Sequence, residues 1–154
     1  MGPRPPEGPS LSRAGFDLLL LCAKEYHPAP NDFPGVGVVY VHLDDSGQPM
    51  TEKEQRQAKN AGRIVADAVR AGRVTLVTCN QGRNRSGLVV ALALHHLTGL
   101  DGWKCIDQVR LLRNTALPEA NEKLELGALV NPWFCDFLVS QTRERPDQGL
   151  RRTS

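Results

Sequence analysis

The sequence predicts a single α/β domain, with a small central and mainly parallel sheet flanked by helices. The 154 residues are enough for one buried core and too few for two ordinary domains. Between residues 13 and 142, short apolar runs alternate with amphipathic stretches, which is typical of parallel strands connected by helices. Residues 1–12 and 143–154 are rich in proline, glycine or charge, and we expect both to be disordered tails.

The first half of this domain contains two predicted strands and one predicted helix. The apolar runs at residues 16–22 and 36–41 have the length of buried strands, and a proline-rich turn separates them. Thr51 and Glu54 then have the spacing of a capping box, in which each side chain bonds the backbone of the other residue. Apolar residues recur on one face of the helix that follows, which should end near Gly72.

The second half begins with a central strand and continues with helices. Residues 74–77 are short, β-branched and apolar, as in a strand that is buried on both faces. A helix that is apolar almost all round follows from Ser86 and should end at Gly99. Asp101 can cap the next helix, and Asn131 can cap the last one, which a proline opens. The stretch between these two helices has no readable pattern.

The composition is that of an ordinary globular protein. Hydrophobic residues make up 40% of the chain and charged residues 23%, so it should fold without a partner. A net charge of +2 is too small for a nucleic-acid coat or a membrane-surface protein, because both need a concentrated basic field. The longest apolar run, residues 18–23, is far shorter than a membrane span, and we therefore expect a cytoplasmic protein.

Most of the cysteines, aromatic residues and helical histidines favour structural roles. The cysteines are widely spaced without a C-x-x-C pair or a zinc-binding pattern, and we expect reduced thiols. His95 and His96 lie on an apolar helix and should be packed or partly exposed there rather than bind a ligand. The expected core residues include Cys22, Cys105, Cys135, Trp103, Trp133 and Phe134.

The loop after the central strand has the chemistry of a phosphate site with a nucleophile. It reads CNQGRNRSG from Cys79, between a buried parallel strand and a helix N-terminus, where free N–H groups favour an anion. Gly82 lets successive N–H groups point inward, and Arg85 offers a planar fork of donors for two phosphate oxygens. The same positive environment favours a thiolate at Cys79, which could attack phosphorus. Ser86 could donate a hydrogen bond to that thiolate or cap the helix.

This loop resembles the C-x5-R-[ST] motif of the cysteine-dependent protein tyrosine phosphatases, and most of all their compact dual-specificity branch. The resemblance extends over about residues 16–138, and it implies the fold of that family, with the phosphate loop between a central strand and a buried helix. Further along the chain, Val109, Arg110 and Arg113 are similar to the family's V-R-x-x-R helix. The residues from Asn131 to Phe134 are similar to its N-x-x-F motif.

The resemblance also implies a mechanism. Cys79 would attack phosphorus to give a phosphocysteine, and Arg85 with the loop N–H groups would hold the phosphoryl oxygens. The acid that protonates the leaving oxygen would come from the loop LDDSG, where Asp45 fits the family register better than Asp44; both could simply be loop formers. No metal or cofactor is expected. The remaining substrate-binding residues would be Asn80, Gln81, Gly82, Arg83, Asn84 and Ser86.

Phosphorylated proteins are the expected substrates, through phosphotyrosine and also phosphoserine or phosphothreonine. Thr78 replaces the histidine that usually precedes the family's cysteine, so a phosphate-binding pseudophosphatase without turnover is an alternative. GRNRSG is similar to the loop of the family's RNA 5′-triphosphatases, and a cation at Arg83 to that of its phosphoinositide phosphatases, so nucleic acid and phosphoinositides remain candidate partners. A sulfurtransferase of the rhodanese kind also carries a cysteine in a cationic loop, but the Arg-Ser-Gly sequence and the acid loop favour the phosphatase.

Overall fold

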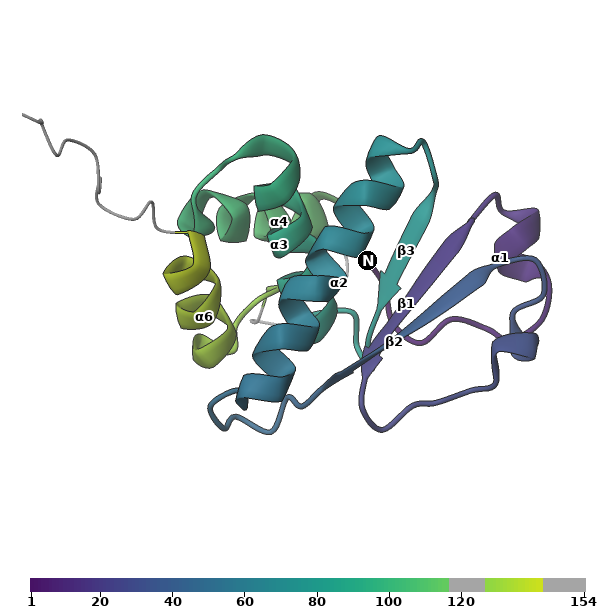
Figure 1. The fold of residues 1–154 in the computed structure, drawn as a ribbon, viewed down its shortest axis with the longest axis horizontal. Coiled ribbons are helices and arrows are strands. Elements are labelled where there is room, and N and C mark those ends of the chain that lie inside the picture. Colours follow the sequence, from purple (N-terminus) through teal and green to yellow (C-terminus); the bar gives the residue numbers. More distant parts are fainter. Residues whose placement is uncertain (117–126, 143–154) are drawn as a thin grey trace, which may run out of the picture.

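The computed structural model of the protein describes residues 1–116 and 127–142, and it has the predicted α/β architecture (Figure 1). Its sheet has three strands, all parallel, in the order β2-β1-β3. These are β1 (Leu18–Ala23), β2 (Gly37–Leu43) and β3 (Thr75–Thr78). Because the three strands run in the same direction, their carboxyl ends meet at one edge of the sheet, where α/β proteins place ligands.

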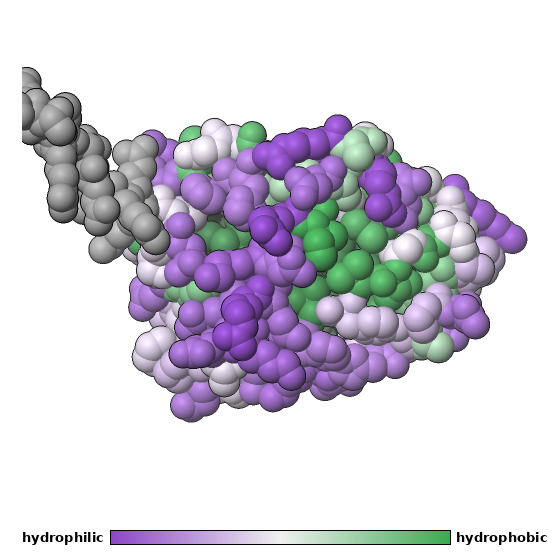
Figure 2. Space-filling model, viewed as in Figure 1, coloured by the Kyte–Doolittle hydropathy of each residue, from purple (hydrophilic) through white to green (hydrophobic). Residues whose placement is uncertain are grey.

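The central strand β1 is buried over its whole length, because both faces of the sheet are covered. Leu18 and Leu20 belong to the large core beneath the helices. Leu19 and Leu21 point to the opposite face, as the alternation of side chains along a strand requires, and pack in a smaller cluster with Phe33. In the space-filling view, a hydrophobic area lies over the sheet and a mainly hydrophilic surface lies over α2 (Figure 2).

The long helices of the described residues are α2 (Glu52–Arg70), α3 (Arg85–Thr98), α4 (Gly102–Ala116) and α6 (Pro132–Thr142). Figure 1 shows α2 crossing beside the strands, with α3, α4 and α6 gathered on its other side. The helices α2 and α3 approach closely at Gly62, where an added Cβ would lie 2.6 Å from the Cβ of Leu92. The missing side chain at this position therefore allows α2 and α3 to lie this close together.

The predicted helix boundaries are confirmed by their capping contacts. The Oγ1 of Thr51 accepts from the N–H of Glu54 at 3.3 Å, and the Glu54 carboxylate accepts from the N–H of Thr51 at 2.9 Å. Gly99 ends α3 in the left-handed region with φ of 73°. The Asp101 carboxylate accepts from the N–H of Lys104 at 3.0 Å at the start of α4. The sequence thus contained the local signals for these helices.

The first residues, predicted from their composition to be a disordered tail, pack against the rest of the domain. Gly2 pairs with Thr78 alongside β3, where the N mark lies in Figure 1. The short helix α1 (Ser10–Arg13) buries Leu11. Backbone pairing with a strand edge needs no apolar periodicity. The composition of these residues therefore predicted a disordered tail although they pair with β3. The predicted tail at 143–154 lies outside the described residues.

Two of the expected core residues are in fact half exposed. Phe134 and the three structural cysteines are buried as predicted, but Trp103 is 55% exposed and Trp133 is 42% exposed. The indole Nε1 of Trp133 donates to the carbonyl of Gly47 at 3.0 Å, so this ring lies across a surface loop instead of entering the core. Among the residues that the structure describes, no helix is long and apolar enough to cross a membrane.

Candidate active site

The loop between β3 and α3 borders a cavity of about 250 Å³ at the carboxyl edge of the sheet. Asp45 reaches this cavity from the loop between β2 and α2. The structure therefore brings together the predicted nucleophile, acid and arginine from separate parts of the sequence. The residues that line the cavity are Asp45, Cys79, Asn80, Gln81, Arg83, Asn84 and Arg85.

The Cys79 thiol is buried and is surrounded by hydrogen-bond donors. Its Sγ lies 3.4 Å from the hydroxyl oxygen of Ser86, and the residue is only 4% exposed. Burial by itself would raise the pKa of this thiol. Hydrogen bonds from the Ser86 hydroxyl and from the N–H groups of Ser86, Arg83 and Gln81 outweigh burial, so the pKa of Cys79 lies below its usual value of 9.0. The loop thus favours the nucleophilic thiolate.

Ser86 fulfils one of its two predicted roles. It is fully buried and contacts the Cys79 sulfur, as expected for a donor to the thiolate. It does not cap α3, because the helix begins one residue earlier at Arg85, and Asn84 occupies the N-cap position without a capping side-chain bond. No capping side chain therefore accepts from the N–H groups at this helix start, and a phosphate bound in the loop could accept from them instead.

Thr78 cannot stabilise the thiolate by a positive charge, as a cationic histidine would. Its side chain is buried and its Oγ1 donates to the carbonyl of Leu20 on the neighbouring strand at 3.2 Å. The hydroxyl is thus used in the sheet, and no positive charge stands directly before the cysteine. Any stabilisation of the thiolate must come from the loop and from the start of α3.

Arg85 is held by a carboxylate that the sequence analysis missed. Its Nη1 and Nη2 donate to the two carboxylate oxygens of Glu25 at 2.5 and 2.8 Å, and Nη1 also approaches the carbonyl of Leu43 at 3.4 Å. The Nε of Arg85 is buried and has no hydrogen-bond partner among the described residues. One donor of the guanidinium is therefore unused in the cavity wall, and a bound phosphate could accept from it.

The ion pair also fixes the protonation of both partners. The hydrogen bond from Arg85 is the main reason why the pKa of Glu25 lies below its usual value. Burial alone would lower the pKa of Arg85, but the bond and the charge of Glu25 raise it. Glu25 follows β1, and parallel strands end at the same edge, so its position after a predicted strand was the available signal.

The structure separates the two candidate acids. Asp45 lines the cavity, and its carboxylate accepts from the side-chain amides of Asn84 at 3.0 Å and Asn131 at 2.8 Å. Asp44 instead forms an ion pair with Lys24 at 2.6 Å, which keeps the pKa of Asp44 below its ordinary value. Asp44 is therefore occupied outside the cavity, whereas Asp45 faces the thiol loop.

Asn84 and Asn131 both position other groups. The side-chain oxygen of Asn84 accepts from the N–H of Val130 at 2.9 Å, while its amide nitrogen holds Asp45. Asn131 was predicted to cap the last helix, and its side chain does accept from the N–H of Trp133 at 3.0 Å. Because Asn131 also donates to Asp45, one hydrogen-bond network joins the start of α6, Asp45 and the loop around Cys79.

The remaining loop residues form hydrogen bonds with residues that are distant in the sequence. The guanidinium of Arg83 donates to the carbonyl of Gly127 at 3.3 Å, and Arg113 donates to the carbonyls of Gln81 and Gly82. Gly82 has a φ of 62°, and an added Cβ would lie 2.3 Å from the carbonyl carbon of Gly2. Glycine is thus required here both by its conformation and by close contact with the first residues of the chain.

Solved structures resemble this fold. Human DUSP28 is 25% identical, with 92% of this chain and 94% of that chain covered and a TM-score of 0.64. The active form of Tk-PTP is 20% identical, with 87% and 83% covered and a TM-score of 0.65. PTPMT1 in complex with PI(5)P is 15% identical, with 86% and 80% covered and a TM-score of 0.63.

The chain is thus similar in fold to dual-specificity phosphatases of the protein tyrosine phosphatase superfamily. The loop around Cys79 lies, in this fold, between a central strand and a buried helix, as the sequence predicted. Neither a protein-family model nor a curated protein matches the sequence. Within the described part of the chain, no group of three His, Cys, Asp or Glu side chains lies close enough together to hold a metal ion.

Proposed function

We propose that the protein is a cysteine-dependent phosphatase that hydrolyses phosphotyrosine, and also phosphoserine or phosphothreonine, in phosphorylated proteins. The observation that carries the proposal is the cavity at the catalytic loop, where Cys79 with a lowered pKa, Asp45 and Arg85 lie together. A thiolate, an acid and a set of N–H donors around one cavity are what phosphoryl transfer to sulfur requires.

In the first step, the Cys79 sulfur attacks phosphorus and forms an S–P bond while the bond from phosphorus to the ester oxygen breaks. The leaving oxygen takes a proton from the Asp45 carboxyl group. The N–H groups of residues 80–85 and the free Nε of Arg85 hold the other phosphoryl oxygens as their charge redistributes. The products of this step are the free alcohol or phenol and a phosphocysteine.

In the second step, the Asp45 carboxylate takes a proton from a water molecule, whose oxygen attacks phosphorus. The S–P bond breaks, its electron pair returns to Cys79 as a thiolate, and inorganic phosphate leaves. The Ser86 hydroxyl, 3.4 Å from the sulfur, stabilises this leaving thiolate by donating a hydrogen bond. The same donor therefore assists the formation of the nucleophile and its release.

The proposal is tested by hydrolysis of p-nitrophenyl phosphate with the reduced protein in EDTA. We expect turnover that Cys79→Ser abolishes, because a serine hydroxyl at this position has no comparable tendency to ionise. The variant should still bind inorganic phosphate, since the loop N–H groups and Arg85 remain. Phosphate binding without any turnover by the unchanged protein would instead support the pseudophosphatase.

The choice of acid is tested with substrates whose leaving groups differ. Asp45→Ala should lower kcat about 100-fold for an alkyl phosphate, whose leaving oxygen needs a proton, and much less for p-nitrophenyl phosphate. Asp44→Ala is the matched control, because it removes a neighbouring carboxylate that is paired with Lys24 outside the cavity. The reverse result, with the large loss in Asp44→Ala, would show that Asp45 is not the acid.

Arg83 gives a reason to compare substrate classes. It lines the cavity beside Arg85, so a substrate with a second phosphate could reach both guanidinium groups. Phosphotyrosine peptides, a phosphoinositide and a 5′-triphosphorylated RNA should therefore be assayed side by side. A higher kcat/KM for the peptides supports protein substrates. A preference for phosphoinositide or RNA that Arg83→Gln removes would support the alternative.

A further inference from the structure

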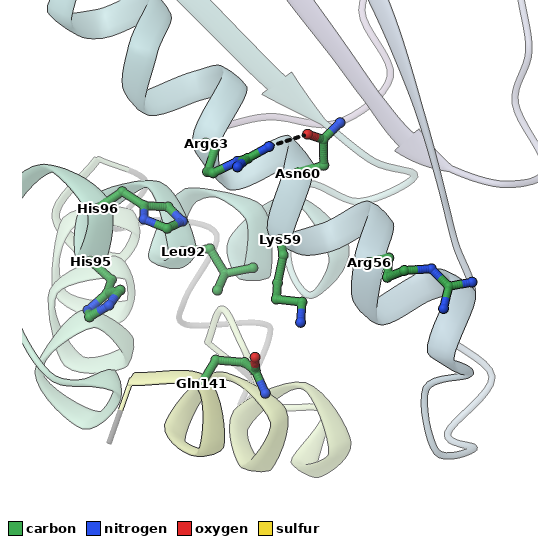
Figure 3. A pocket seen from close by; sticks show the side chains of 8 residues that line it. All are labelled: Arg56, Lys59, Asn60, Arg63, Leu92, His95, His96 and Gln141. Atoms are coloured by element: carbon green, nitrogen blue, oxygen red, sulfur yellow. Dashed lines mark hydrogen bonds between the residues drawn. The ribbon is translucent and has the colours of Figure 1, made fainter. Parts of the chain in front are cut away.

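A second cavity lies between α2, α3 and α6, away from the catalytic loop. It has a volume of about 350 Å³ and shares no residue with the cavity around Cys79. Its α3 residues are near the end of that helix, and His95 is ten residues, or roughly 15 Å, along the axis from Arg85. Figure 3 shows the lining side chains, which are Arg56, Lys59, Asn60, Arg63, Leu92, His95, His96 and Gln141.

One wall of this α2–α3–α6 cavity is a row of cations. Arg56, Lys59 and Arg63 come from successive turns of α2, so they share a helical face and span roughly 10 Å along it. In the described ranges, neither Lys59 nor Arg63 has an acidic partner within 4.0 Å, and Arg63 donates only to the side chain of Asn60 at 3.2 Å. The contact between Arg56 and Glu52 is 3.6 Å long and both side chains are largely exposed, so it holds Arg56 weakly.

On the opposite wall, the pKa of His96 is lowered by burial and in part by nearby positive charges. His96 lies at the end of α3, and burial is the first reason why the pKa of its imidazole is lowered. The charges of His95, Arg63 and Arg70 lower the pKa further, against a smaller opposing effect of Asp67. Leu92 contributes an apolar surface to the cavity. The cavity therefore combines a positive field with a recessed shape, a combination that favours an anionic group.

We propose that the α2–α3–α6 cavity binds an acidic segment of a partner protein. In an extended peptide, side chains two residues apart point to the same side at a spacing of about 7 Å. Two acidic residues at that spacing could thus reach two of the three cations on α2. The lysine and arginine side chains of α2 and the carboxylates of the partner segment would be complementary in charge. Such complementarity provides selectivity and faster association.

The shape and the sequence argue against other occupants. A membrane surface would be met by a flat or protruding basic face, whereas this cavity is recessed between helices (Figure 3). The last residues, 143–154, contain four arginines against one glutamate and one aspartate, so their charge does not match the cavity.

The proposal is tested with a fluorescein-labelled Glu-Ser repeat of eight residues and the full chain. We expect saturable binding that a Gln-Ser repeat does not show. The double variant Lys59→Gln with Arg63→Gln should weaken binding about fivefold, the effect of losing two exposed ion pairs. The control is Lys53→Gln with Arg13→Gln, which removes the same charge from exposed positions outside the cavity and should leave the affinity within about twofold.

The binding site is located by amide NMR, without any need for turnover. The peptide should shift the resonances of residues 56–63 and 92–96 and leave those of residues 79–86 in place. Failure of the phosphatase assay would therefore not affect this test. The proposal is overturned if the Glu-Ser peptide does not saturate, if both double variants lose equal affinity, or if only phosphatidylserine vesicles bind through Lys59 and Arg63.

Discussion

Replacement of Glu25 tests whether its ion pair with Arg85 orients that arginine for the proposed reaction. The Glu25 carboxylate accepts two hydrogen bonds from Arg85, at 2.5 and 2.8 Å. The Arg85 side chain is 8% exposed and that of Glu25 is 40% exposed, so water screens the carboxylate but hardly reaches the guanidinium. Glu25→Gln keeps the size of the side chain and removes its charge and one of its two acceptors. The guanidinium should then turn more freely about its last bonds.

The magnitude follows from the hydrogen bonds that are lost. A hydrogen bond to a charged group contributes about 1.5 to 3 kcal/mol, and the exposure of Glu25 reduces this to about 1 to 2 kcal/mol for the pair. If Arg85 needs this orientation in the transition state, kcat/KM should fall about 10-fold, since 1.4 kcal/mol corresponds to one decade. Arg85 acts on the phosphoryl oxygens and not on the leaving group. The loss should therefore be equal for alkyl and p-nitrophenyl phosphates, unlike the loss in Asp45→Ala.

The assay is the rate of both substrates at neutral pH, with Glu52→Gln as the control for removal of an exposed, weakly paired carboxylate. A Glu25→Gln variant with a kcat/KM within twofold of the unchanged protein would refute the argument. A loss confined to alkyl phosphates would also refute it, because that pattern belongs to the acid. Circular dichroism at the assay temperature separates an effect on the site from loss of the fold.

The same ion pair predicts a dependence of stability on pH. Because the pKa of Glu25 is lower in the folded protein than its ordinary value of 4.5, the unfolded chain binds the proton more tightly. The contribution of Glu25 to stability is thus fully present above about pH 4.5 and is lost as the pH falls through the folded pKa. The difference in unfolding free energy between the unchanged protein and Glu25→Gln should be constant near pH 7 and shrink in acid.

Two further substitutions test the loop. Ser86→Ala removes a hydrogen bond that lowers the pKa of Cys79. The rate of thiol alkylation by iodoacetamide should therefore reach its half-maximum at higher pH. Ser140→Ala is a surface control and should leave this pH profile unchanged. An unshifted profile would mean that the N–H groups alone stabilise the thiolate. Gly82→Ala places a Cβ 2.3 Å from the carbonyl carbon of Gly2 at a φ of 62°. The variant should therefore lose about 1 to 2 kcal/mol of unfolding free energy in urea and bind phosphate more weakly. An unchanged affinity for phosphate would contradict the required loop geometry.

Local signals in the sequence predicted most of the helices, because caps act between near neighbours. The capping box of Thr51 and Glu54 and the glycine at Gly99 mark helix ends without reference to the rest of the fold. The association of residues 1–12 with the domain could not be predicted in this way. It depends on backbone bonds between Gly2 and the free edge of β3, and backbone groups are the same in every residue type.

The loop around Cys79 was predictable for a similar reason, since its proposed nucleophile and arginine lie within seven consecutive residues. The partners that hold those residues come from distant segments. Glu25 is 60 positions from Arg85, and Asn131 is 86 positions from Asp45. Only the parallel sheet and the return of α6 bring these side chains to one edge. The different surroundings of Asp44 and Asp45 also needed the fold, because the sequence does not indicate which carboxylate meets Lys24.

The way the thiolate is stabilised explains how a chain with Thr78 before the cysteine could still carry a nucleophile. A histidine would supply a full positive charge, but here the hydroxyl of Thr78 is committed to the carbonyl of Leu20. The charge of Arg85 is itself largely balanced by Glu25. What lowers the pKa of Cys79 is a set of neutral donors, the Ser86 hydroxyl and the loop N–H groups. Fixed dipoles need no reorganisation when sulfur changes charge, so a loop of this geometry favours the thiolate both before attack and after release.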